Sequence, residues 1–225
     1  MSMNSIIDNF VAPPCMQEIE ILAEEEHFLL INKPSGLLSL SGKNPLNKDS
    51  VHYRLVQEYP TASMVHRLDL GTSGIMLVAL NKAANANLAR QFQLRTVTKI
   101  YQSILNGHLD DERGQISAAI AKDPQLFPRL KICQISGKQA LTDYQVIERS
   151  NEPNASRVMF YPKTGRTHQL RIHSQYLGHP ILGCDLYGTA QSHQASSRLL
   201  LHAEKLEFDH PITGTRVYGK CACPF

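Results

Sequence analysis

The 225-residue sequence predicts an α+β domain built on one large mixed β-sheet. Two observations carry this prediction. Strand-like segments outnumber helical segments, and the connections between successive strands vary in length, which argues against a regular strand–helix–strand repeat. Neither a linker nor an internal repeat divides the chain, so we expect an N-terminal arm over 1–17 and one domain over 18–225.

The expected strands are short runs in which apolar residues alternate with polar ones or follow one another directly. They cover residues 18–22, 28–32, 75–80, 99–105, 140–148, 156–162 and 199–208. The third run, IMLVAL, is apolar throughout and predicts a strand that is buried on both faces. The fifth and sixth runs are expected to form a hairpin-like pair. Residues 106–140 are rich in turn formers and predict only loops and short pieces of structure.

Three segments have the spacing of apolar residues that favours helices, namely 49–60, 81–95 and 167–178. The first ends at a proline. The second is rich in alanine and carries Leu88 and Phe92 four residues apart, on one helix face. In the third, Thr167 is expected to cap the start of the helix and Gly178 to end it.

Composition narrows the class of protein. The net charge of +3, from 23 basic and 20 acidic residues, neither requires nor excludes a nucleic-acid partner. Five widely spaced cysteines, an odd number, indicate reduced thiols in a cytoplasmic protein rather than a disulfide framework. Cys221 and Cys223 lack the second pair of ligands that a structural zinc site needs. The sequence shows neither a membrane span nor a secretory signal.

The stretch VHRLDLGTSG, residues 65–74, places Asp69 in a glycine-bounded turn just before the apolar run 75–80. A rigid strand aims the residues of the loop beside it, so this is a favourable position for a reactive carboxylate. If the strands 75–80 and 99–105 are parallel, Asp69 and Tyr101 lie at the same sheet edge. A carboxylate opposite an aromatic ring then predicts a pocket for a flat substrate.

The stretch PKTGRTHQLRIH, residues 162–173, concentrates basic side chains in one strand–turn–helix. Its lysine and first arginine, next to the amide groups of a helix start, are suited to binding phosphate. His168 and Arg171, three residues apart, can face one side. A buried carboxylate needs a cation nearby to stay ionised, and Arg171 can supply that charge to Asp69.

Each of these features also has a purely structural interpretation. Arg67 and Asp69 could form a surface ion pair that contributes under ~1 kcal/mol. Tyr101 could be a core aromatic, and the basic helix could be a solvated face. His66, His168 and His173 could suggest a metal, although the cations beside them disfavour one. Only the combination of the features favours an active site.

Several motifs together carry a family resemblance. HRLDLGTSG resembles the H-R-L-D-x-x-T-S-G signature of the RluA family of pseudouridine synthases. NKPSGLLS, KIYQSILNGH, TGRTHQLRIHSQYLGHPILG and LLLHAEKLEFDHP are similar to further motifs of that family, in the same order. The resemblance implies a single pseudouridine-synthase-like domain, with a mainly antiparallel sheet flanked by helices and loops around a catalytic cleft. It is strongest to the short RluA type, which is implied to act on 23S ribosomal RNA and transfer RNA.

The resemblance also implies a reaction and roles for residues. Uridine in RNA is isomerised in place to pseudouridine, without metal or organic cofactor and without an obligate protein partner. Asp69 matches the catalytic aspartate, Tyr101 the active-site tyrosine, and Arg171 the arginine that pairs with the aspartate. Arg67 matches the arginine that fills the space left by the flipped base. The base pocket is expected at Leu200 or Leu201.

Further RNA contacts are expected from basic residues of the same two stretches, which are His66, Lys163, Arg166 and His168. The sequence departs from the family pattern twice. It has Gly183-Cys184-Asp185-Leu186-Tyr187 instead of G-D-x-x-Y, and its first motif ends LLSLSG instead of V-P-G. We expect neither departure to touch the chemistry. Two rival functions stay open, a non-catalytic RNA-binding module and an N-glycosidase that hydrolyses the same bond.

Overall fold

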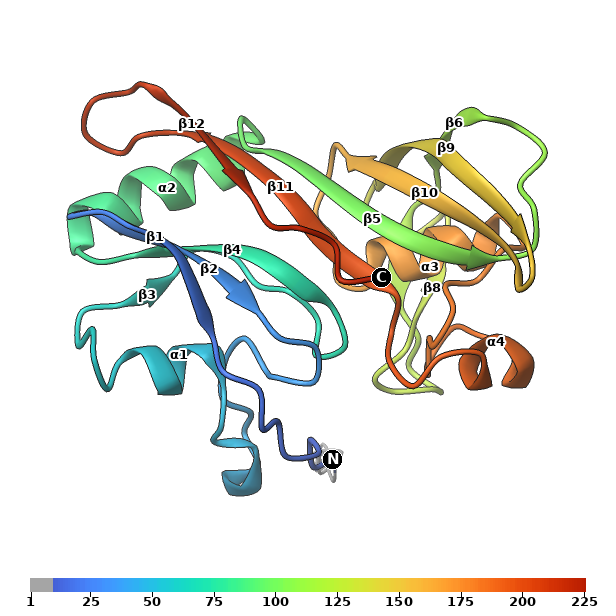
Figure 1. Ribbon diagram of the computed structural model, residues 1–225, viewed down its shortest axis with the longest axis horizontal. Coiled ribbons are helices and arrows are strands. Elements are labelled where there is room, and N and C mark those ends of the chain that lie inside the picture. Colours follow the sequence, from blue (N-terminus) through green and yellow to red (C-terminus); the bar gives the residue numbers. More distant parts are fainter. Residues whose placement is uncertain (1–9) are drawn as a thin grey trace.

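The computed structural model describes residues 10–225, and most of its strands form one mixed sheet (Figure 1). Within these residues the sheet has ten strands, in the order β1-β2-β4-β11-β5-β10-β9-β6, with β3 beside β4 and β12 beside β11. These strands are β1 (Glu20–Glu24), β2 (Phe28–Lys33), β3 (Ser63–Met64), β4 (Ser73–Ala79), β5 (Thr98–Asn106), β6 (Arg113–Ser117), β9 (Leu141–Asn151), β10 (Asn154–Pro162), β11 (Leu201–Asp209) and β12 (Arg216–Lys220). Strands β7 (Ile120–Lys122) and β8 (Leu130–Ile132) pair separately.

Among the strands of residues 10–225, only β4 and β11 pair in parallel, and all other paired strands are antiparallel. This confirms the predicted α+β class and its mixed, mainly antiparallel sheet. The parallel contact is short, with His202 opposite Ser73 and Ala203 opposite Gly74. β4 and β11 therefore meet at one end only, and the two halves of the sheet diverge beyond that contact (Figure 1).

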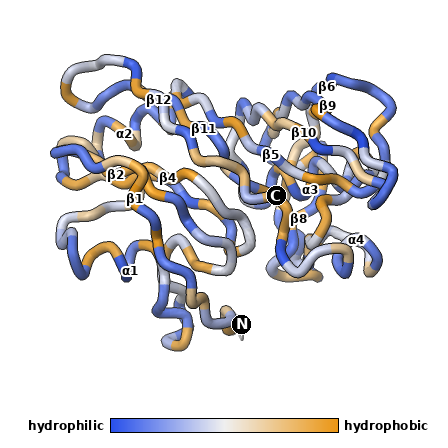
Figure 2. The backbone as a smooth tube through the Cα atoms, viewed as in Figure 1, coloured by the Kyte–Doolittle hydropathy of each residue, from blue (hydrophilic) through white to orange (hydrophobic). Residues whose placement is uncertain are grey.

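Each half of the sheet has its own core. One core gathers around β2 and β4, whose residues are almost all buried and largely hydrophobic (Figure 2). The other gathers around β5, β10 and the helix α3 (Gln169–Tyr176). Tyr101 packs against both cores. The site that follows lies where these two halves meet.

The helices largely follow the predictions. They are α1 (Val51–Leu55), α2 (Lys82–Leu94), α3 and α4 (Ala190–Gln194), with a 3-10 turn η1 (Pro45–Asn47) before α1. The predicted helices over 49–60 and 81–95 are confirmed, with Leu88 buried on α2. The sequence did not predict α4 or β12. No helix of residues 10–225 is long and apolar enough to cross a membrane.

The predicted cap of the third helix is wrong. His168, not Thr167, precedes α3, with a φ of 56° and no hydrogen bond from its side chain to the helix start. The Gln169 side chain accounts for this arrangement, because its Oε1 accepts from the Arg166 amide at 2.9 Å and from the Thr164 hydroxyl at 2.8 Å. The chain must therefore turn sharply at His168.

The described part of the predicted arm, residues 10–17, lies along η1 and α1. The Ala12 amide donates to Asn47 Oδ1, and the Arg54 guanidinium donates to the carbonyls of Cys15 and Gln17. The first nine residues of that arm lie outside the described residues. All five cysteines fall within 10–225 and are free thiols, as the sequence predicts.

Candidate active site

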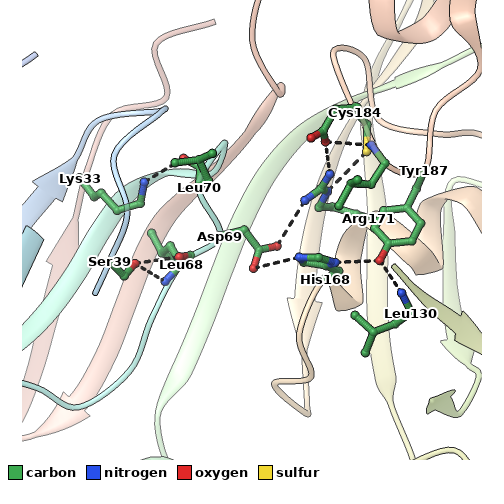
Figure 3. A network of polar contacts seen from close by, with 12 residues as sticks. Lys33, Ser39, Leu68, Asp69, Leu70, Leu130, His168, Arg171, Cys184 and Tyr187 are labelled. Carbon is green, nitrogen blue, oxygen red and sulfur yellow. Dashed lines mark hydrogen bonds and ion pairs between the residues drawn. The ribbon is translucent and has the colours of Figure 1, made fainter. Parts of the chain in front are cut away.

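The loop over 65–72 that precedes β4 carries Asp69, and the end of β2 together with the loop that follows it holds this loop on both sides of Asp69. Lys33 is fully buried, and its Nζ donates to the Leu70 carbonyl at 3.1 Å and to two carbonyls of the loop that follows β2. The Ser39 hydroxyl donates to the Leu68 carbonyl at 2.7 Å and accepts from the Leu68 amide at 3.1 Å. The backbone on either side of Asp69 is therefore fixed (Figure 3).

Ser39 is the last residue of the NKPSGLLS stretch, which is similar to the first motif of the family. Its side chain holds the residue next to Asp69, whereas the departure from the family pattern begins at the following residue, Leu40. Lys33 meets carbonyl oxygens rather than a carboxylate. Burial lowers the pKa of its ammonium group to about 7.

Tyr101 lines the same cavity as Asp69, but the predicted geometry is only half right. β4 and β5 are not parallel neighbours, because β11 lies between them and β5 runs antiparallel to it. The pairing nevertheless aligns Tyr101 with Ala203, and Ala203 with Gly74, at the start of β4. The burial of Tyr101 and the charge of Asp69 raise the pKa of the phenol, so it stays protonated at neutral pH.

Arg171 faces Asp69 from α3, across the cleft. Its Nη1 lies 3.9 Å from Asp69 Oδ2, and only 5% of its side chain is exposed. Arg171 also donates from Nη2 to Asp185 Oδ1 and from Nε to Cys184 Sγ, the latter at 3.4 Å. Burial opposes the charge of Arg171, but Cys184, Asp69 and Asp185 together raise its pKa. The cation next to Asp69 is therefore permanent.

The Gly183–Tyr187 stretch was expected not to touch the chemistry, and this prediction is wrong. Cys184 and Asp185 both contact Arg171, and the Tyr187 ring lies 5.2 Å from its guanidinium carbon. The signal in the sequence was the departure of this stretch from the family pattern. It places a thiol, Cys184, and a carboxylate, Asp185, next to each other shortly after the helix that carries Arg171. Sequence position alone could not show that the loop folds back onto α3.

His168 approaches Asp69 from the other side. Its Nε2 lies 4.0 Å from Asp69 Oδ1, and its Nδ1 lies 2.7 Å from the Tyr187 hydroxyl. The Tyr187 oxygen also accepts the Leu130 amide at 2.9 Å (Figure 3). Burial lowers the pKa of His168, as does Arg171, while Asp69 raises it, and the net direction is downward. The imidazole is therefore neutral at neutral pH.

A cavity of about 620 Å³ contains these side chains. Its lining joins the two halves of the sheet and includes Asp69, Tyr101, His168 and Arg171, together with the predicted residues His66, Arg67, Arg166 and Leu201. It also includes two cations that the sequence analysis did not select, Arg95 and Lys99.

Two residues predicted at the site lie outside this lining. Lys163 pairs with Asp143, with Nζ 3.3 Å from Oδ2. Leu200 and Leu201 both pack in the core beside α3, but only Leu201 also lines the cavity.

His66 and Arg67 differ although they are neighbours. His66 Nε2 accepts the Leu77 amide at 2.9 Å, and its ring stacks on Phe92 with the centroids 4.6 Å apart. Burial, aided by Lys99, lowers the pKa of His66 to about 3, so it is neutral. Arg67 is exposed, and among the described residues it has neither a hydrogen bond nor an ion pair with Asp69. The interpretation of Arg67 and Asp69 as a surface ion pair is therefore wrong.

Comparison with known proteins shows the family of the chain. The family model for RNA pseudouridylate synthase matches residues 27–176. The chain belongs to this family. Its similarity to curated members extends beyond the matched segment to almost the whole length of both chains.

Two of these relatives are enzymes of bacteria. The dual-specificity RNA pseudouridine synthase RluA of Yersinia pestis is 45% identical over 205 residues, which cover 91% of this chain and 99% of that protein. The protein of the same name from Escherichia coli (strain K12) is 42% identical over 213 residues, covering 95% and 97% of the two chains. The RluA-family resemblance seen in the motifs is thus confirmed.

Among solved structures, human RNA pseudouridylate synthase domain containing 1 superposes with a TM-score of 0.80 and 33% sequence identity. The superposition covers 95% of this chain and 86% of the human one. The single pseudouridine-synthase-like domain predicted from the sequence is therefore confirmed. Among residues 10–225 no group of three or more His, Cys, Asp or Glu side chains could hold a metal ion.

Proposed function

We propose that this protein isomerises specific uridines in structured RNA to pseudouridine, with Asp69 as the essential carboxylate. The observation that carries the proposal is the arrangement in one cavity of an aspartate, a protonated tyrosine and a buried arginine. The family of the chain supports it. By analogy with the RluA type, we propose 23S ribosomal RNA and transfer RNA stem-loops as substrates and the cytoplasm as the place of action.

The reaction moves one glycosidic bond. The N1–C1′ bond of uridine breaks, C1′ joins C5, the C5 proton leaves to solvent, and N1 takes up a proton. Three routes use an ionised Asp69, namely attack on C1′, addition to C6, and removal of the C2′ proton. In each of them the positive charge of Arg171 lies 3.9 Å from the reacting carboxylate.

The target base must leave its helix or loop to reach this cavity, which costs a few kcal/mol. Tyr101 and Leu201 offer the uracil ring an aromatic and an apolar surface. Arg67 is exposed at the cavity and is free to occupy the position that the base leaves. Arg95, Lys99 and Arg166 add positive charge around the same opening for the phosphate backbone.

The test uses RNA labelled with tritium at C5 of uridine. We expect tritium release together with pseudouridine in the digested product. A non-catalytic RNA-binding module would bind the RNA without releasing tritium. An N-glycosidase would leave free uracil and an abasic site. Mapping of pseudouridine at single-base resolution, in cells with and without the protein, then identifies the modified positions.

A further inference from the structure

We propose that His168 is a positioning residue for Asp69, held by Tyr187 as the neutral imidazole tautomer that carries its proton on Nε2. This inference rests on the proposed function and assigns a role different from the RNA contact predicted for His168 from the sequence. It follows from the contacts on the two ring nitrogens and on the tyrosine oxygen (Figure 3).

The tautomer follows from counting protons at the Tyr187 hydroxyl. The Leu130 amide, at 2.9 Å, has only one proton to donate, so the Tyr187 oxygen accepts it. The hydroxyl proton then needs an acceptor, and His168 Nδ1 lies at 2.7 Å. A nitrogen that accepts cannot carry a proton in neutral imidazole, so the ring proton sits on Nε2.

In the other protonation states of His168, fewer polar groups have a hydrogen-bond partner. A proton on Nδ1 would point at a tyrosine oxygen that already accepts from Leu130, and no other described acceptor is within hydrogen-bond distance of the Tyr187 proton. A doubly protonated ring would add a charge close to Arg171, in a site where burial already lowers the pKa of His168. Tyr187 itself is 1% exposed and cannot turn to water.

The backbone points the ring toward Asp69 at a conformational cost. His168 has a φ of 56°, in the left-handed region, which costs about 1–2 kcal/mol for a residue with a side chain. Within residues 10–225, Arg95 is the only other non-glycine residue with positive φ. Strained residues of this kind concentrate at functional sites when the surrounding structure enforces them.

The two donors face opposite oxygens of one carboxylate. Arg171 Nη1 lies 3.9 Å from Oδ2, and His168 Nε2 lies 4.0 Å from Oδ1. A small inward movement of Asp69 or His168 brings Nε2–H to hydrogen-bond distance. With both oxygens oriented, Asp69 presents a fixed direction to the reacting nucleotide, and this orientation contributes to the rate rather than to RNA affinity.

The kinetic test measures tritium release under single-turnover conditions, with RNA affinity measured separately. His168→Leu should slow release about 10- to 100-fold, as expected when one hydrogen bond to a charged group is lost, while the Kd for RNA changes less than about twofold. His168→Gln, which keeps an N–H donor near Nε2, should recover most of the rate. The matched control, His193→Leu on the exposed surface of α4, should leave both quantities unchanged.

The structural test is nitrogen NMR of the imidazole groups. The unchanged protein should show His168 protonated at Nε2 and unprotonated at Nδ1 at neutral pH. Tyr187→Phe should abolish this single tautomer and slow release about 3- to 10-fold, a fraction of the effect of losing the donor itself. Tyr218→Phe, at a tyrosine that is 72% exposed, should do neither.

Specific results would overturn the inference. A proton on Nδ1 of His168, or a charged ring, contradicts it even if His168→Leu fails to fold. An unchanged single-turnover rate with weakened RNA binding in His168→Leu would return His168 to the RNA-contact role. Absence of tritium release by the unchanged protein would instead count against the proposed function, while the tautomer would still report on the Tyr187 contact.

Discussion

The contact between Arg171 and Asp69 supports a prediction whose size follows from the structure. We consider Arg171→Met, which keeps much of the side-chain volume and removes the charge. At 3.9 Å and an effective dielectric constant of about 20, the attraction between the two charges is about 4 kcal/mol. Since the Asp69 side chain is 18% exposed, water that approaches it offsets about half of this loss. The remaining ~2 kcal/mol corresponds to about a 30-fold slower reaction.

A double-mutant cycle on stability isolates this pair. The free energy of unfolding in urea is measured for the unchanged protein, Asp69→Asn, Arg171→Met and the double variant. Arg171→Met leaves a partly buried carboxylate without its cation, and Asp69→Asn removes that charge, so the two changes should not add. We expect a coupling free energy of about 2 kcal/mol. Single-turnover tritium release by Arg171→Met should fall about 30-fold, with RNA affinity changed less than about threefold.

Arg216→Met provides the control for this experiment. Its guanidinium pairs with Asp209 at 3.1 Å and with Glu207 at 3.7 Å, on the β11–β12 hairpin outside the cavity. It should leave the rate unchanged. A coupling below about 0.5 kcal/mol between Asp69 and Arg171, together with an unchanged rate in Arg171→Met, would refute the assignment of Arg171 as the cation of the site.

Three further predictions concern other charged or ionisable groups. The pKa of Lys33 is about 7 in the folded protein, against 10.5 for an ordinary lysine. Between these pH values the folded protein binds fewer protons than the unfolded chain, so its stability increases as the pH rises. The unfolding free energy of the unchanged protein minus that of Lys33→Met should therefore increase from pH 7 to about pH 10, and a flat difference would contradict the burial of a titrating amine. Lys99→Met should lower the slope of log Kd for RNA against log salt concentration by about 1, because Lys99 lines the cavity. The control Lys82→Met, at the exposed start of α2, should leave the slope unchanged. Equal slopes for Lys99→Met and the unchanged protein would exclude a phosphate contact of Lys99. Because the pKa of Tyr101 is raised, Tyr101→Phe should leave the ultraviolet phenolate titration unchanged up to about pH 10, and a missing component below that pH would show a phenol that ionises normally.

The sequence was most informative where local pattern determines structure. The apolar run 75–80 became the buried strand β4, and Leu88 is buried on α2 as its spacing indicated. The cavity is lined by Asp69, Tyr101 and Arg171, each of which lies beside or on a strand or helix that the sequence predicted. Patterns of this kind depend on which face of an element is buried, so they can be interpreted without knowledge of the tertiary contacts.

Non-local contacts explain what the sequence could not predict. The insertion of β11 between β4 and β5 joins segments that are far apart along the chain, and no local pattern encodes that pairing. The contacts of Cys184 and Asp185 with Arg171 depend on how their loop folds back onto α3. The left-handed turn at His168 arises because the side chain of Gln169 takes the positions that a capping residue would use.

Asp69 is the residue on which the proposed chemistry depends, and its replacement by asparagine keeps the shape of the side chain while removing the charge. The most direct measurement is therefore pseudouridine formation by Asp69→Asn at saturating RNA, in a single turnover. We expect the rate to fall by about four orders of magnitude or more while the Kd for RNA stays within about threefold. Pseudouridine formation at a near-normal rate in this variant would contradict the account.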